Sequence, residues 1–139
     1  MKLVGIFAFV ASLLFVVLHL LTKQSQEVRT IRAQVAEGLE VSGGVRAAVT
    51  EFFLENREWP TDNDAVDLAP ADEIVGNYVS GVSVEDGVVV VTYGNSAQDS
   101  IQGHSIWFEP DESNPPAVSW SCYRSDIADE FLPSTCRSN

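Results

Sequence analysis

The sequence predicts an α+β fold, in which one long N-terminal helix packs against a four-stranded antiparallel β-sheet and the chain closes with a loop between two cysteines. Three observations predict it. An uncharged apolar run near the N-terminus continues as an amphipathic helix pattern, short β-prone segments alternate with turn residues after residue 60, and Cys122 and Cys136 lie near the end. The chain has 139 residues, of which 45% are hydrophobic. This composition excludes general disorder, and the length excludes a large multidomain enzyme.

Residues 3–21 are nineteen consecutive residues without a formal charge. A helix of that length spans about 28 Å, close to the hydrocarbon thickness of a bilayer. No small-residue cleavage pattern follows at residues 19–24, so we expect a retained transmembrane anchor, with residues 1–27 as the membrane part of the helix. His19 is either a buried protonation or partner site or a neutral imidazole reaching toward the headgroups, and we favour the second interpretation. The side chains expected to contact lipid or other helices are Leu3, Ile6, Phe7, Phe9, Val10, Leu13, Leu14 and Val17.

The apolar pattern continues beyond the anchor with a different spacing. From Val28 to Phe53 apolar residues recur at steps of three and four, and charged residues fill the other faces, which predicts an amphipathic continuation of the same helix. The glycines around Gly43 predict a weak point. The helix should end at Glu58, because Pro60 pushes the residue before it, Trp59, out of the α region. We assign residues 28–139, including this half of the helix, to a globular head. The residues expected to pack the helix on the head are Val35, Leu39, Val45, Val49, Phe52, Phe53 and Trp59.

The rest of the head is predicted to be an antiparallel sheet with one apolar face available to cover the helix. The four β-prone runs are residues 78–84, 88–93, 105–109 and 117–122. The first two flank Glu85-Asp86-Gly87, a hairpin signal because glycine tolerates the positive φ that a tight turn requires. Residues 60–77 lack a clear period and are predicted to form a connecting loop with room for a short helical turn.

Charge is distributed unevenly along the chain. The net charge is −12, from 20 acidic and 8 basic residues. Residues 1–59 hold six acids and six bases, whereas residues 60–139 hold fourteen acids against Arg124 and Arg137. Phosphate recognition needs clustered lysine and arginine, so the acidic head is not expected to bind nucleic acid.

Cys122 and Cys136 have two interpretations. In an oxidising compartment they form one disulfide, and closing a loop of about 15 residues stabilises the fold by about 3 kcal/mol in the chain-entropy model. In a reducing compartment they are two ordinary thiols. A zinc site is disfavoured because it needs about four ligands and the histidines, His19 and His104, are distant in sequence. The membrane anchor favours export, and hence the disulfide.

Several motifs occur in a fixed order along residues 28–139. They are Arg32-Ala33-Gln34-Val35-Ala36-Glu37-Gly38-Leu39, Trp59-Pro60-Thr61-Asp62-Asn63, Gly76-Asn77-Tyr78-Val79, Trp120-Ser121-Cys122 and Leu132-Pro133-Ser134-Thr135-Cys136-Arg137. Together with the long apolar helix, this ordered set resembles a type IV pilin, of the type IVa-like kind. The resemblance implies a ladle fold whose helices bundle into a filament core, an exposed head, and a surface loop bounded by a Cys122–Cys136 disulfide.

The resemblance also implies a function and a location. It implies a structural subunit of a type IV pilus, or fimbrium, which polymerises through its hydrophobic helix into a homo-oligomeric filament for adhesion, twitching motility or DNA uptake. Before assembly the subunit would lie in the inner membrane, where other pilus-assembly or envelope proteins meet it, and afterwards in the extracellular pilus.

The N-terminus departs from the family pattern. Pilin precursors carry a short basic leader, a Gly-Phe cleavage site and an early glutamate, whereas here Gly5 precedes Ile6 and no carboxylate occurs before Glu27. An alternative function follows, that of a membrane-anchored accessory protein or secretion pseudopilin acting as an interaction module. No Ser/His/Asp set, phosphate-binding glycine loop or metal-ligand spacing occurs in the sequence, so we predict no enzymatic activity, cofactor or metal.

Overall fold

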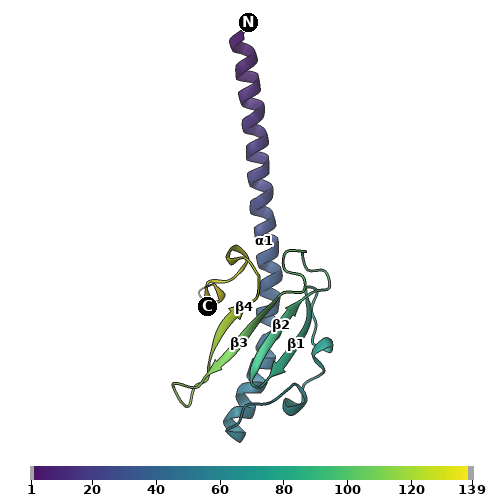
Figure 1. Cartoon of the computed structure of the whole chain (residues 1–139), viewed down its shortest axis with the longest axis vertical. Helices are drawn as coiled ribbons and strands as arrows, with labels where there is room; N and C mark the ends of the chain where they lie inside the picture. The colour runs from purple at the N-terminus through teal and green to yellow at the C-terminus, as the bar shows by residue number, and fades with distance from the viewer. Residues whose placement is uncertain (1, 138–139) are drawn as a thin grey trace. The chain divides into compact units, whose positions relative to one another are not determined.

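A computed structural model describes the backbone of residues 2–137 and the side chains of residues 4–137. The chain divides into two compact units, Met1–Thr30 and Ile31–Asn139. The first is helical wherever it is described, and the second, the head, combines the rest of the helix with a four-stranded sheet (Figure 1). The predicted fold class is confirmed. The predicted boundary between a membrane part, residues 1–27, and a head, residues 28–139, stays a prediction.

Helix α1 (Lys2–Asn56) is continuous through Gly43 and Gly44, where the sequence predicted a weak point. Neighbouring Ser42 and Val45 are buried in the head, so tertiary packing outweighs the low helix propensity of glycine. The helix ends two residues before the predicted end at Glu58. Arg57 adopts a left-handed conformation, with φ 60°, and its N–H still donates to the carbonyl of Phe53 at 2.8 Å.

The sheet is an antiparallel meander in the order β1-β2-β3-β4. Its strands are β1 (Val79–Glu85), β2 (Val88–Tyr93), β3 (Ser105–Asp111) and β4 (Ser119–Arg124). The predicted hairpin is present: Glu85 pairs with Val88, and the two residues between them, Asp86 and Gly87, have φ values of 49° and 86°. Positive φ at both central positions matches the right-handed twist of the strands.

The core of the head forms where the inner face of the sheet meets one face of α1. Alternate residues of β2 and β3 point inward, so that Val89, Val91, Ile106 and Phe108 are buried. They share one hydrophobic cluster with Ile31, Val35, Val45 and Val49 of α1. Burial of this helical stripe, rather than intrinsic propensity, explains why residues 31–56 form a stable helix in the head.

The segment between α1 and β1 is a loop with two short turns, η1 (Asp64–Val66) and η2 (Ala71–Glu73), as the sequence suggested. Asn63, only 8% exposed, holds it to the sheet. Its Nδ2 donates to the carbonyls of Ala69, at 2.9 Å, and Val82, at 3.1 Å, and its Oδ1 accepts from the N–H of Val84 at 2.7 Å. One amide side chain therefore serves the outer edge of β1.

We expect Asn63→Ala to lower the free energy of unfolding of the head by about 2 kcal/mol, because it leaves buried backbone groups without partners. Urea unfolding followed by tryptophan fluorescence measures this, since Trp59, Trp107 and Trp120 all lie in the head. Asn95 is unsuitable as a control, because its Nδ2 also donates to two backbone carbonyls, those of Gly76 and Val79. Exposed Asn114→Ala is the matched control. Equal unfolding midpoints for Asn63→Ala and Asn114→Ala would contradict the assignment.

The C-terminal segment is closed by a disulfide between Cys122, in β4, and Cys136. Between them lie η3 (Asp129–Phe131) and η4 (Ser134–Cys136). Ile127 and Leu132 are each 1% exposed and insert into the core. Arg124 forms an ion pair with Asp129 and donates from Nη1 to the carbonyl of Ile127 at 3.2 Å. The loop is therefore attached to the head by buried apolar anchors as well as by the disulfide.

Candidate functional site

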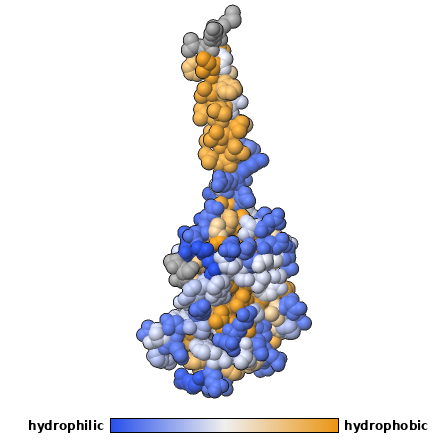
Figure 2. Space-filling model, in the orientation of Figure 1, coloured by the Kyte–Doolittle hydropathy of each residue, from blue (hydrophilic) through white to orange (hydrophobic). Residues whose placement is uncertain are grey.

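The first unit carries a large uncovered apolar surface. Its exposed fractions include 62% for Ile6, 71% for Phe7 and 72% for Phe9. Val10, Leu13, Leu14 and Val17 are also exposed, at 45–58%. The remaining predicted residue of this group, Leu3, has a side chain outside the described residues. Figure 2 shows the surface as a band of hydrophobic residues on the helix.

This segment is long and apolar enough to cross a membrane. Two hydroxyls just after the apolar run bond to the helix itself: those of Thr22 and Ser25 donate to the carbonyls of His19 and Thr22, each at 2.9 Å. The ring of His19 lies parallel to that of Phe15, with 6.4 Å between centroids. An apolar surface of this extent requires lipid or protein around it.

Most of the residues predicted to pack the helix on the head belong to the hydrophobic cluster shared with the sheet or pack against it, whereas Phe52 lines a pocket with Ala65, Val66 and Asp67 of the connecting segment. Val35, Val45, Val49 and Phe53 are buried, and Leu39, Phe52 and Trp59 are partly buried. The ring of Trp59 stacks on that of Phe53, with 3.9 Å between centroids. Trp59 also lies against Gly87 in the β1–β2 turn, where a Cβ would approach the tryptophan Cβ to 2.9 Å.

A further contact between helix and sheet involves Tyr93, which sequence reasoning missed. Tyr93 is fully buried, and its hydroxyl donates to the carbonyl of Val35 at 2.9 Å. Burial, with a smaller contribution from Glu37, raises the pKa of Tyr93, so the phenol stays protonated and acts as a donor. Gly38 makes room for the ring, because a Cβ there would lie 2.4 Å from the tyrosine oxygen.

Glu37 and Gln34 attach loops of the head to the helix, and neither was predicted as a site residue. The carboxylate of Glu37 accepts from the N–H groups of Asn77, at 2.9 Å, and Tyr78, at 2.7 Å. The Oε1 of Gln34 accepts from the N–H of Gln98 at 2.9 Å. In the sequence, both residues appeared only as part of the motif at residues 32–39. The bonding partners of Glu37 are 40 and 41 residues away, which no local pattern indicates.

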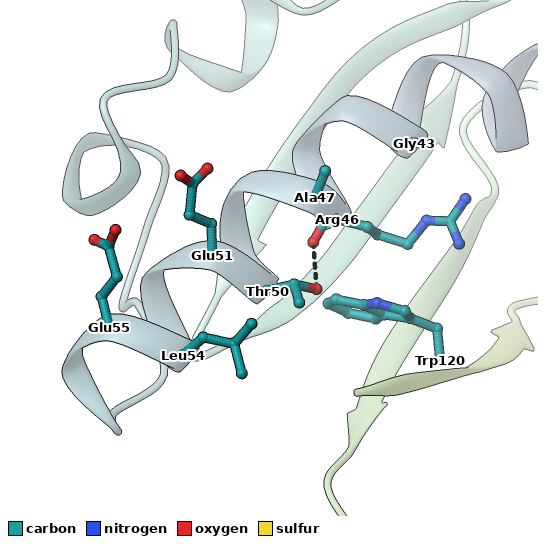
Figure 3. Close-up of a pocket in the computed structure, with 8 residues that line it drawn as sticks. All are labelled: Gly43, Arg46, Ala47, Thr50, Glu51, Leu54, Glu55 and Trp120. Atoms are coloured by element: carbon teal, nitrogen blue, oxygen red, sulfur yellow. Dashed lines mark hydrogen bonds between the residues drawn. The ribbon is translucent and has the colours of Figure 1, made fainter. Parts of the chain in front are cut away.

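A groove of about 610 Å³, the α1–β4 groove, opens between the C-terminal half of α1 and the edge strand β4 (Figure 3). It is lined by Gly43, Arg46, Ala47, Thr50, Glu51, Leu54, Glu55 and Trp120. Figure 3 shows Trp120 reaching from β4 toward Thr50, while Glu51 and Glu55, at the far rim, project away from Trp120. The groove therefore has an apolar wall and an acidic rim.

Arg46 lines this groove but is held by the head. Its guanidinium lies over the ring of Phe108, 4.3 Å from the centroid, and its Nη2 donates to the carbonyl of Leu39 at 3.3 Å. Desolvation lowers the pKa of Arg46. Because these contacts hold the Arg46 guanidinium, the charged groups of the groove that remain without a partner in the described part of the chain are the carboxylates of Glu51 and Glu55.

The acidic side chains of the head lie mostly in solvent. Asp111 accepts from the N–H of Ser113 at 2.8 Å, and this bond lowers the pKa of Asp111. Glu109 accepts from the indole N–H of Trp107 at 3.2 Å. Within the described residues, no group of three or more His, Cys, Asp or Glu side chains is placed to hold a metal ion.

The uncovered apolar helix and the four-stranded head define the class of protein, a subunit whose helix must be covered by lipid or by protein. A family model described as pilin, a bacterial filament protein, matches residues 31–137. The chain belongs to the pilin family.

Its similarity extends to individual pilins. The type IV major pilin protein PilE of Neisseria gonorrhoeae is 34% identical over 132 residues, covering 79% of this chain and 77% of that protein. A fimbrial protein of Neisseria meningitidis serogroup A is 33% identical over 130 residues, covering 78% and 76%. Fimbrial protein EcpC of Eikenella corrodens is 30% identical over 112 residues, covering 77% and 71%.

Membership of this family determines the general role of the chain. It is a structural subunit of a pilus, anchored in the membrane before assembly and extracellular afterwards. The family is structural rather than enzymatic.

Proposed function

We propose that this chain is a main building subunit of a type IV pilus, which polymerises with copies of itself through the exposed apolar helix. The single observation that carries the proposal is the uncovered apolar surface on a chain of the pilin family. The proposed assembly residues are Ile6, Phe7, Phe9, Val10, Leu13, Leu14 and Val17, together with Leu3. Removal of this surface from water is the driving force for membrane residence and for bundling.

The head supports the same proposal through its charge. All of the net charge of −12 belongs to residues 60–139, so a filament of such subunits carries a strongly acidic exterior, which favours its solubility. The loop between Cys122 and Cys136 exposes Asp126, Asp129 and Glu130. We propose that this surface is displayed on the filament, and that the filament serves adhesion, twitching motility or DNA uptake, the last without phosphate contacts by the head.

Shearing cells and sedimenting the filaments tests the proposal. Mass spectrometry should recover the wild-type chain as a dominant protein of the sheared fraction. Recovery only in the membrane fraction would overturn the proposal and favour a stationary accessory protein.

A charged substitution in the apolar helix tests which surface assembles. We expect Leu14→Lys to lower the sheared yield at least about tenfold at equal total protein, because a lysine at the centre of an apolar span costs about 3 kcal/mol. Val75→Lys is the matched control, since Val75 is 49% exposed on the head and Leu14 is 58% exposed on the helix. Equal yields from the two variants would argue against assembly through the helix.

A further inference from the structure

The α1–β4 groove changes character along its length. Toward its N-terminal end lie Gly43 and Ala47, and no heavy atom lies within 4 Å of a Cβ placed on Gly43. Toward its C-terminal end the rim carries Glu51 and Glu55, which are exposed and have no hydrogen bond or ion pair among the described residues. An occupant should therefore be apolar where it packs closely against Gly43 and Ala47, and cationic where it meets Glu51 and Glu55.

Cations free to fill this role are few. Arg124 is paired with Asp129, Arg137 donates to the carbonyl of Leu132, Arg32 donates to that of Glu130, and Arg46 is held as described. Among the side chains that the structure describes, only three cations have no hydrogen bond, ion pair or ring contact: Lys23, Arg29 and Arg57. Arg57 follows the helix end, so it cannot be the cation of an apolar helical segment.

Arg29 and Lys23 both follow the apolar run, and Arg29 has the matching spacing. Leu21 and Arg29 are eight residues apart, as are Ala47 and Glu55. Both segments are helical, so each pair spans about 12 Å along its helix axis. One face of this helical segment carries, at steps of three and four, Leu18, Leu21, Ser25 and Arg29. The face is apolar at its N-terminal end, has a small residue at its centre and is cationic at its C-terminal end.

We propose that the α1–β4 groove of one copy receives residues 18–29 of a second copy, in parallel orientation. Leu18 and Leu21 of the second copy lie against Gly43 and Ala47, and its Arg29 lies against Glu55 and Glu51. The inference rests on the proposed function, because it requires copies that assemble side by side. The inference goes beyond that function because it identifies the surface that accepts the neighbouring subunit and the residues that face each other there.

Charge and desolvation select the parallel orientation. In the antiparallel orientation Leu21 would cover Glu55 and Arg29 would face Ala47, so a carboxylate and a guanidinium would each lose water without a partner. In the parallel orientation the apolar ends meet and the opposite charges meet. Leu54, 41% exposed, and Trp120 supply further apolar surface on the groove side.

A charge exchange within one chain tests the proposed register. We expect Arg29→Glu and Glu55→Arg, each alone, to lower the sheared filament yield at least about tenfold, because each places like charges together at every subunit contact. The combined variant Arg29→Glu/Glu55→Arg should return the yield to within about twofold of wild type. Glu58→Arg, the same change at an exposed residue outside the groove, should have no effect. Total protein and closure of the Cys122–Cys136 disulfide verify that each variant folds.

The outcomes separate the two proposals. Wild-type yield from both single variants, or a combined variant no better than the worse single one, would overturn the groove contact while leaving the filament proposal intact. Absence of the wild-type chain from sheared filaments would overturn the proposed function itself.

Cross-linking tests the contact independently of charge. Leu21→Cys/Ala47→Cys should give a ladder of covalent oligomers from sheared filaments after mild oxidation, and each single variant should give none. Leu21→Cys/Ser96→Cys, with the second cysteine on an exposed loop of the head, is the control. A ladder from the control pair but not from the groove pair would mean that another surface occupies this position, and would overturn the proposal.

Discussion

Replacement of both cysteines, Cys122→Ser/Cys136→Ser, is expected to lower the free energy of unfolding of the head by about 3 kcal/mol, because the bond closes a loop of about 15 residues in the unfolded chain. The native pair is separated by 14 positions, and both sulfur-bearing residues are buried. Without the bond the segment is still held by the apolar anchors Ile127 and Leu132 and by polar contacts such as the Arg124–Asp129 ion pair. Urea unfolding of the detergent-solubilised full chain should show a midpoint lower by about 1–3 M.

The same variant should also show less protein in the sheared filament fraction, since a destabilised head is exposed to proteolysis outside the cytoplasm. Ser121→Ala, one position from Cys122 on the same strand, is the control for a change in β4 itself. An unchanged urea midpoint together with full surface display would show that the disulfide does not stabilise this head.

Gly38→Ala is expected to destabilise the head by about 3 kcal/mol, near the upper end for inserting a methyl group into a packed core. The added Cβ would lie 2.4 Å from the Tyr93 oxygen and 2.8 Å from its Cζ, so the ring must move and give up its hydrogen bond to Val35. Helix and sheet would therefore lose their contact at the Val35 carbonyl and the Tyr93 hydroxyl. The expected readout is a lower urea midpoint in tryptophan fluorescence.

Gly44→Ala provides the matched control in the same helix. No heavy atom lies within 4 Å of a Cβ at Gly44, and the residue is exposed. Alanine has the higher helix propensity, so this variant should be more stable than wild type by about 1 kcal/mol. Destabilisation of similar size by both substitutions would mean that Tyr93 is not the reason for glycine at position 38.

These expectations differ in how much of their basis was present in the sequence. The length of α1, the alternation of buried and exposed residues in the strands, and the Asp86-Gly87 turn follow from local periodicity and from backbone preferences that act within a few residues. The helix end at Asn56 was missed by two residues because the sequence showed Pro60 as the terminating signal, whereas the backbone already leaves the helix at the left-handed Arg57.

The polar contacts of the head were not predictable in the same way. Asn63 appeared only as part of a motif, and nothing local distinguished it from Asn77 or Asn114. Its partner Val84 is 21 residues away, and Tyr93 reaches Val35 across 58 residues. Such pairs depend on how far the helix slides along the sheet, and that register is set by the summed packing of the core.

The sequence by itself determined that this chain has an apolar helix too long for its small head to cover, an acidic C-terminal part and an antiparallel sheet, because hydrophobic period and charge are local properties. Only the tertiary structure decided that Glu37, Asn63 and Tyr93 attach the helix and its loop to the sheet, and that Gly43, Glu55 and Trp120 line one groove. Those groups come from separate segments, and their neighbours are chosen when the buried faces of helix and sheet close together and exclude water.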